Sequence, residues 1–176
     1  MSTMFNFKKL DQRTRTLMVE EIDLAIQNNK LYFSTRFNDR GRNGWPGALR
    51  KAAESSDSHR LAFDLQQASA MKHMEGRATP SGGYTTAHVP DTAAETLADG
   101  QFNRFYIAAI CRRAIEDNVS SVIVYRAKFS QEPRPESAAL EGAARNPKDL
   151  LEEVRDHDTS LKCDLLKPNS GLSIDY

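Results

Sequence analysis

The spacing of apolar residues predicts three helices in the first part of the chain. Residues 1–10 are mixed, and we expect an arm there. Asp11 then opens a helical pattern. A second helix is expected over 46–55, with Pro46 in its first turn, and Asp57 caps a third. The apolar positions are Leu17, Met18, Ile22, Ala25 and Ile26 in the first helix, and Leu61, Leu65, Ala68 and Met71 in the third.

Two stretches between these helices lack helical spacing. Residues 30–37 alternate and are rich in aromatic side chains, so they form either a short strand or an extended connector. The segment 38–47 holds Asn, Asp, three Gly and a Pro, which together predict a loop.

The segment 76–90 differs from the helical stretches around it. Its pair Gly82 and Gly83 adopts positive φ easily, and mostly small or polar residues flank that pair. This pattern predicts a flexible polar hairpin or loop. Because the segment holds few large apolar groups, we expect Gly82, Gly83 and Tyr84 either to be mobile or to contact a partner.

A long helix is expected over 92–118. Its start, 92-TAAE-95, matches a capping box, in which Thr92 caps the third following amide and Glu95 reaches back. Gly100 interrupts the pattern, so the segment forms either two helices that meet there or one helix with a weak point. The aromatic and apolar positions at core spacing are Phe102, Phe105, Tyr106 and Ala109.

The strongest strand signal lies at 119–127, which is β-branched and apolar. The uninterrupted run 122-VIV-124 indicates burial on both faces of that strand. A loop over 130–142 enters about one helical turn, Pro147 starts a last helix, and 168–176 is a candidate terminal strand.

These elements describe one α-rich α+β domain with a small sheet around 119–127, an N-terminal arm and a glycine-rich extended loop. A chain of 176 residues suits a single hydrophobic core. In order, the expected parts are an arm (1–10), a helical segment (11–75), a flexible loop or hairpin (76–90), and a last part with the long helix, strand, C-terminal helix and tail (91–176).

Composition and charge narrow the classes of function. The chain carries 24 basic and 24 acidic residues, so it lacks the basic excess of a protein that mainly binds phosphates. Apolar residues make up 39%, and we expect the arm, the loop and the tail to bury little without a partner. Cys111 and Cys163 form no disulfide framework. The sequence has no apolar run that suits a signal peptide or a membrane span, so we expect a soluble protein of the cytoplasm, or of a virion.

The motifs that would indicate catalysis, a metal or a cofactor are missing from the sequence. The four histidines lack metal-ligand spacing, and we interpret His157, between two aspartates, as part of a solvated helix end. A metal nuclease needs an acidic residue two positions before its lysine, but Arg126 stands there before Lys128, although Asp91 lies upstream. Cys111, in an apolar helical run, suits a buried inert thiol. We therefore expect no catalytic, cofactor-binding or metal-binding residues.

Two groups of basic residues indicate an alternative function, nucleic-acid binding. One group lies at 36–42 and the other extends over 104–134. Such side chains neutralise phosphates, but the sequence has no helix-turn-helix, zinc-finger or ribonucleoprotein motif. The residues considered for interaction are Arg36, Arg40, Arg42, Arg104, Arg112, Arg113, Arg126 and Lys128.

The order of elements up to about residue 127 resembles that of the capsid proteins of tailed phages. An arm and a helix are followed by a glycine-bearing loop (76–90), a long helix (92–118) and a strand (119–127). The resemblance implies that 76–90 clasps a neighbouring subunit, that the long helix is a spine, and that catalytic residues are absent. This chain departs from that family in its short length and in the three helices before the loop.

We therefore expect a non-enzymatic, self-associating structural protein, of the type found in phage or prophage virions, whose partners are other copies of itself. The alternative is a nucleic-acid-associated protein that uses the two arginine groups. A third class is an enzyme whose site is assembled from residues scattered in the sequence.

Overall fold

The computed structural model describes residues 4–156 and 163–176, which form one α-rich α+β domain, as expected. The elements in chain order are α1 (Gln12–Gln27), α2 (Asp39–Ser55), α3 (Ser58–Gln67), β1 (Met74–Ala78), β2 (Tyr84–His88), α4 (Ala93–Glu116), β3 (Val122–Arg126), α5 (Pro135–Leu140), β4 (Ala144–Arg145), α6 (Pro147–Arg155), the 3₁₀ helix η1 (Asp164–Leu166) and β5 (Leu172–Asp175).

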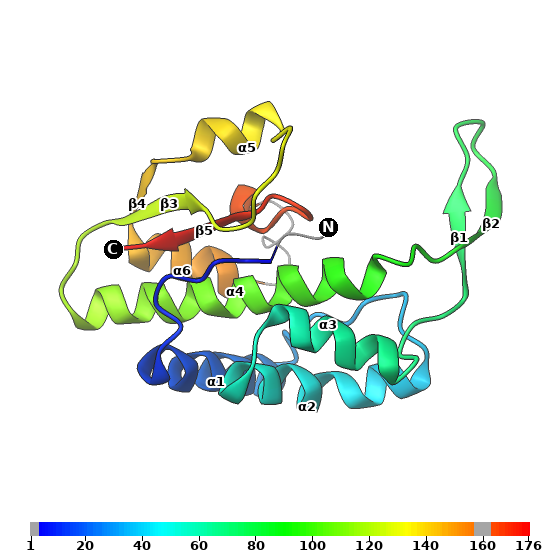
Figure 1. Ribbon diagram of the computed structural model, residues 1–176, viewed down its shortest axis with the longest axis horizontal. Coiled ribbons are helices and arrows are strands. Elements are labelled where there is room, and N and C mark those ends of the chain that lie inside the picture. Colours follow the sequence, from blue (N-terminus) through cyan, green and yellow to red (C-terminus); the bar gives the residue numbers. More distant parts are fainter. Residues whose placement is uncertain (1–3, 157–162) are drawn as a thin grey trace.

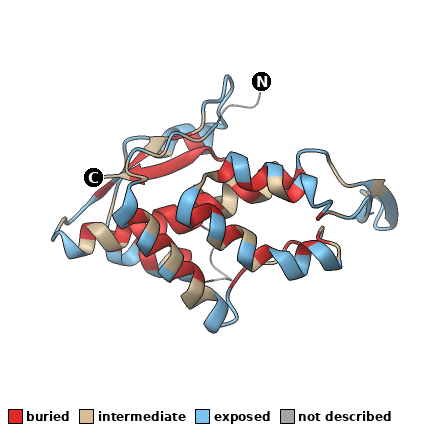
Figure 2. Cartoon of the chain, turned by 60° about the horizontal axis from the view of Figure 1, so that its bottom comes forward, coloured by how far each residue is buried: buried red, intermediate tan, exposed pale blue. Residues whose placement is uncertain are grey.

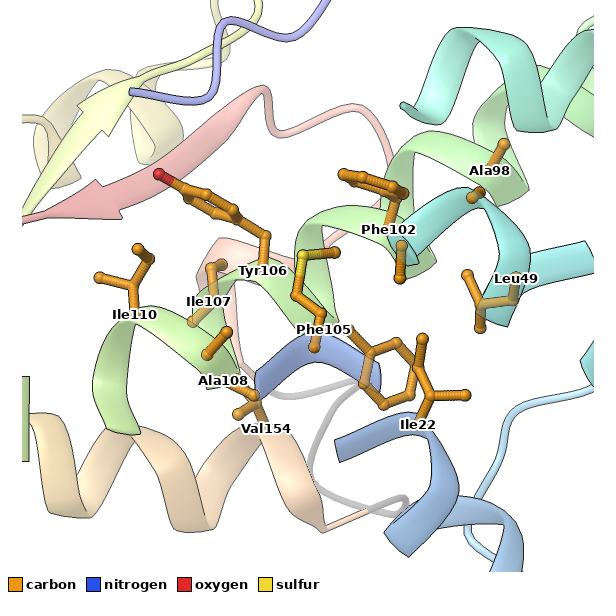
Figure 3. Packing of buried hydrophobic residues seen from close by; sticks show 14 of the residues in the cluster. Ile22, Leu49, Ala98, Phe102, Phe105, Tyr106, Ile107, Ala108, Ile110 and Val154 are labelled. Atoms are coloured by element: carbon orange, nitrogen blue, oxygen red, sulfur yellow. The ribbon is translucent and has the colours of Figure 1, made fainter. Parts of the chain in front are cut away.

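Helix α4 runs through the centre of the domain as one continuous helix (Figure 1). Helices α1 and α3 pack along one side of it, and α6 and β5 also contact it. Phe102 and Tyr106 are completely buried, and Tyr106 points toward β5 and the N-terminal arm (Figure 3). The core position expected for the aromatic residues of this helix is therefore confirmed, and Gly100 does not break it.

Helix α2 begins earlier than the helix expected from the sequence. The prediction of a loop over 38–47 is wrong, because α2 includes all of this segment after Asn38 and continues through Pro46. Asn38 caps the helix by accepting a hydrogen bond from the Gly41 amide at 2.9 Å. Trp45 is completely buried on the inner face of α2. Burial of this large side chain favours a helix where the local composition favours a loop.

Side-chain caps mark the expected starts of α1 and α3. Asp11 and Asp57 each accept a hydrogen bond from the third following amide, at 3.0 and 2.8 Å. The capping box predicted for α4 is wrong, because Thr92 makes no side-chain cap bond. Glu95 instead accepts a hydrogen bond from the Lys128 ammonium at 2.9 Å.

The three-stranded antiparallel sheet has the order β4-β3-β5. The prediction that β3 is buried on both faces is wrong. Val122 and Val124 are buried, but Ile123 between them is 42% exposed, as the alternation of an antiparallel strand requires. The terminal strand is confirmed as β5, in which Leu172 and Ile174 are completely buried.

The N-terminal arm packs against its own chain. The Phe7 ring centroid lies 5.3 Å from that of Phe102 and 4.6 Å from that of Tyr106. The Asn6 amide donates a hydrogen bond to the Ala127 carbonyl at 2.8 Å. The arm and β5 therefore bury apolar groups within the domain, and the expectation that arm and tail bury little without a partner is wrong for their described residues.

The connection between α1 and α2 and the end of α3 complete the helical part of the fold. Residues 30–37 form an extended connector with one isolated bridge, from Phe37 to Met71. Helix α3 ends at Gln67, so Ala68 is exposed instead of continuing the apolar stripe.

Among the described residues, no helix combines the length and the apolar character needed to cross a membrane.

Candidate interaction surface

Strands β1 and β2 form a hairpin that extends away from the domain and carries Gly82, Gly83 and Tyr84 (Figure 1). Gly82 has a φ of +85°, a region that other residues rarely adopt. Thr79 closes the turn, because its amide donates to the Gly83 carbonyl at 2.8 Å and its hydroxyl accepts from the Gly83 amide at 3.0 Å. The hairpin predicted for this segment is thus confirmed, and it begins slightly earlier in the chain than expected.

The two faces of the hairpin differ in charge. Residues paired across the strands point to the same side, so each face can be assigned from the register. One face, called the Tyr84 face below, consists of Met74, Gly76, Ala78, Tyr84, Thr86 and His88. It carries no Asp, Glu, Lys or Arg, and Tyr84 is 86% exposed and Met74 41% exposed. The opposite face carries Glu75 and Arg77.

The hairpin is open at its edges and fixed at its base. It has two strands only, and within the part of the chain that the structure describes neither outer edge pairs with a further strand. Most of its residues are exposed (Figure 2). At the base, the Arg36 guanidinium donates to both oxygens of Glu75, at 2.6 and 3.1 Å. Hydrogen bonds from Arg36 lower the pKa of Glu75, so this ion pair is present at neutral pH.

The first arginine group does not form one basic surface. Arg36 forms an ion pair with Glu75. Arg42 lies over the Phe33 ring, with its guanidinium carbon 4.9 Å from the ring centroid. Among the described residues, Arg40 makes a long contact of 3.4 Å to the Ala68 carbonyl. Arg40 and Arg42 lie on helix α2, not on the loop expected from the sequence.

Four residues of the second group are each paired with a carboxylate. The pairs are Arg112 with Glu20 at 2.8 Å, Arg113 with Asp11 at 2.7 Å, Arg126 with Glu141 at 2.6 Å, and Lys128 with Asp99 at 2.6 Å and Glu95 at 2.9 Å. Each of these cations already contacts a carboxylate, which weakens its attraction for a phosphate. The partners are far apart in sequence, as with Asp11 and Arg113, so the sequence alone does not reveal them.

Two charged side chains, Arg104 and Glu21, are buried, which their positions in the sequence did not predict. Arg104 is 3% exposed, and its Nε donates to the Val154 carbonyl at 2.8 Å. Burial lowers the pKa of Arg104, and the nearby Asp156 opposes that effect. Glu21, also 3% exposed, accepts hydrogen bonds from Arg155 at 2.9 and 2.7 Å. Burial of a charge inside a helical pattern depends on tertiary packing, so periodicity gives no signal for it.

Cys111 and the candidate metal ligands do not form a reactive site among the described residues. Cys111 is completely buried, and this burial raises the pKa of its thiol, which disfavours the nucleophilic thiolate. Among the described residues, no group of three or more His, Cys, Asp or Glu side chains is placed to hold a metal ion. His157 lies outside the described residues.

Comparisons of the chain with protein-family models, curated proteins and solved structures find no match.

Proposed function

We propose that this protein is a non-enzymatic structural protein that assembles with other copies of itself through hairpin β1–β2. The observation that carries the proposal is the form of the hairpin, an exposed two-stranded ribbon with open edges and an uncharged, tyrosine-bearing face. A hairpin of two strands has marginal stability by itself. Burial of the Tyr84 face against another chain would therefore stabilise it.

A protein surface is the partner that suits this face. Tyrosine is enriched at the centres of protein interfaces, because it contributes a large contact area with a polar end. Open strand edges offer backbone hydrogen bonds to an extended segment or sheet edge of a neighbour. A nucleic acid is a poorer partner, because the Tyr84 face has no lysine or arginine.

Another copy of this chain is the partner we propose. The order of arm, hairpin, long helix and strand is the one that resembles tailed-phage capsid proteins, in which an extended loop clasps neighbouring subunits. The domain also presents apolar side chains that a neighbour can cover, namely Ile123 on the open face of β3, which is 42% exposed, and Phe129, which is 64% exposed. A phage or prophage virion is the assembly to test first.

Light scattering coupled to size-exclusion chromatography tests the proposal over a range of protein concentrations. We expect a mass well above the 19.7 kDa of one chain for the wild type, and a smaller species for Tyr84→Ser. Phe63→Ser, which replaces a 44% exposed aromatic residue on α3, is the matched control and should leave the mass unchanged. A strictly monomeric wild type at high concentration would contradict the proposal. Salt-sensitive binding of duplex DNA by that monomer would support the nucleic-acid alternative instead.

A further inference from the structure

A hollow of about 240 Å³ lies between α1, α4 and α6, away from the hairpin. Its wall combines cations with apolar side chains. Among the described lining residues, the cations are Lys30, Arg104 and Arg155, and the carboxylate is Glu21. The apolar wall consists of Leu24, Ala25, Phe105, Ala108 and Val154. Apolar walls with a few charged groups are typical of sites for small organic ligands.

Arg104 is the group in this wall that lacks a complete set of partners. Its Nε is bonded to the Val154 carbonyl, but its Nη1 is buried and has no hydrogen-bond partner among the described residues. Leaving a buried donor of a charged group without an acceptor is costly. Arg104 also lines a second hollow of about 150 Å³, next to Tyr32 and Ser34. Arg104 is therefore shared by both hollows, and rotation of its long side chain would direct Nη1 to an acceptor in either one.

Among the described residues, the other charges around the first hollow leave it with an excess of positive charge. Glu21 is already bonded to Arg155 and lies 3.3 Å from Arg112. Asp156 acts electrostatically on Arg104 but does not bond the free Nη1. Lys30 adds an exposed ammonium group to the wall. The hollow thus offers two cations, Arg104 and Lys30, to an incoming anion.

We propose that this hollow binds a small organic carboxylate, with its carboxylate group on Arg104 and Lys30 and its hydrocarbon part against Leu24 and Phe105. The ligand carboxylate accepts a charge-assisted hydrogen bond from Nη1 and so supplies the acceptor that this group lacks. The apolar wall distinguishes such a ligand from an inorganic anion. This site is independent of assembly through the hairpin, so either proposal can fail without the other.

Three probes separate the contributions of charge and hydrocarbon. Hexanoate has both, hexanol has only the chain, and inorganic phosphate has only charge. Titration of the full chain, followed by amide shifts in two-dimensional NMR spectra, should show saturable shifts at Ala25 and Phe105 with hexanoate and weak or no shifts with the other two. Lys30→Gln should weaken hexanoate binding about two- to fivefold, as expected for an exposed ion pair. Ala25→Leu, which fills part of the hollow, should abolish it.

Circular dichroism of both variants should match the wild type, since Lys30 is exposed and Ala25 is only partly buried. Arg104→Gln provides a further test where it folds, with a loss of at least about tenfold in affinity. Hexanoate shifts that are absent, that spread over the whole surface, or that persist unchanged in Ala25→Leu would overturn the proposal. Equal binding of hexanol would overturn the role of Arg104 and Lys30, and equal binding of phosphate would overturn the role of the apolar wall.

Discussion

Replacing Gly41 with alanine tests the unexpected start of helix α2. A Cβ atom at this position would lie 2.1 Å from the Ala70 carbonyl oxygen and 2.7 Å from the Phe37 ring. The Ala70 carbonyl is held in place, because it accepts a hydrogen bond from the Asn38 amide at 3.1 Å. Rotation of a side chain cannot relieve a clash with the backbone. Overpacking costs about 1–3 kcal/mol, and we place Gly41→Ala at the upper end, about 3 kcal/mol.

Gly44 and Gly47 on the same helix provide matched controls. A Cβ atom at either position has no neighbouring atom within 4 Å. Alanine is favoured over glycine in a helix by about 0.5–1 kcal/mol, so each substitution should stabilise the protein. In a domain of this size, 1 kcal/mol changes Tm by roughly 2–4 °C. Gly41→Ala should therefore lower Tm by about 6–12 °C, and each control should raise it by about 1–4 °C.

Thermal and urea unfolding, followed by far-UV circular dichroism, measure these differences. The sign of the change distinguishes the two interpretations of this segment. If Gly41→Ala is as stable as the wild type, the close contact between α2 and the Ala70 carbonyl is incorrect. If Gly44→Ala destabilises the protein, residue 44 does not lie in a helix and the loop interpretation regains support.

Three further predictions concern caps, acid and thiols. Asn146→Ala should lower the free energy of unfolding by about 1 kcal/mol, because the Asn146 side chain caps α6. Thr92→Ala should change it by less than about 0.5 kcal/mol, because the Thr92 side chain makes no cap bond. Equal losses of stability for the two variants in urea unfolding would contradict this. A hydrogen bond from Arg113 lowers the pKa of Asp11 below its unfolded value, so the pair adds stability above about pH 4 that is lost as the pH falls through the folded pKa. Asp11→Asn retains the cap but should reduce this acid-induced loss of stability, and an unchanged pH profile would refute the role of the charge. Burial raises the pKa of Cys111, so a thiol reagent should modify it only after unfolding, and rapid labelling of the native protein would show that it is accessible.

Much of the fold follows from local signals in the sequence. Asp11 and Asp57 identify helix starts, because a capping side chain acts on amides within its own first turn. The start of α2 could not be predicted in this way. Its glycines and proline favour a loop, and the helix depends on the burial of Trp45 and on the close approach of Gly41 to a distant segment. The open face of β3 likewise depends on what the rest of the chain covers.

In the candidate interaction surface too, local features could be predicted from the sequence, whereas features that depend on tertiary packing could not. Gly82 and Gly83 predicted the hairpin, because the turn requires positive φ at the first of them. The ion pairs of Arg112, Arg113 and Lys128 were not predictable, because their carboxylate partners are distant in sequence. Arg104 occupies an ordinary position in the helical pattern, and only the packing of α6 against α4 shows that it is buried and incompletely bonded.

Hydrogen exchange of the hairpin amides tests the central claim most directly. The measurement compares residues 74–88 at low and high protein concentration, with Tyr84→Ser as the control. Contact with another copy predicts that wild-type hairpin amides exchange more slowly as concentration rises, while those of Tyr84→Ser stay fast. Exchange of the hairpin amides at the same rate at every concentration would contradict assembly through the hairpin. The contradiction would be strongest if the protein were then an oligomer whose protected amides lie at other residues.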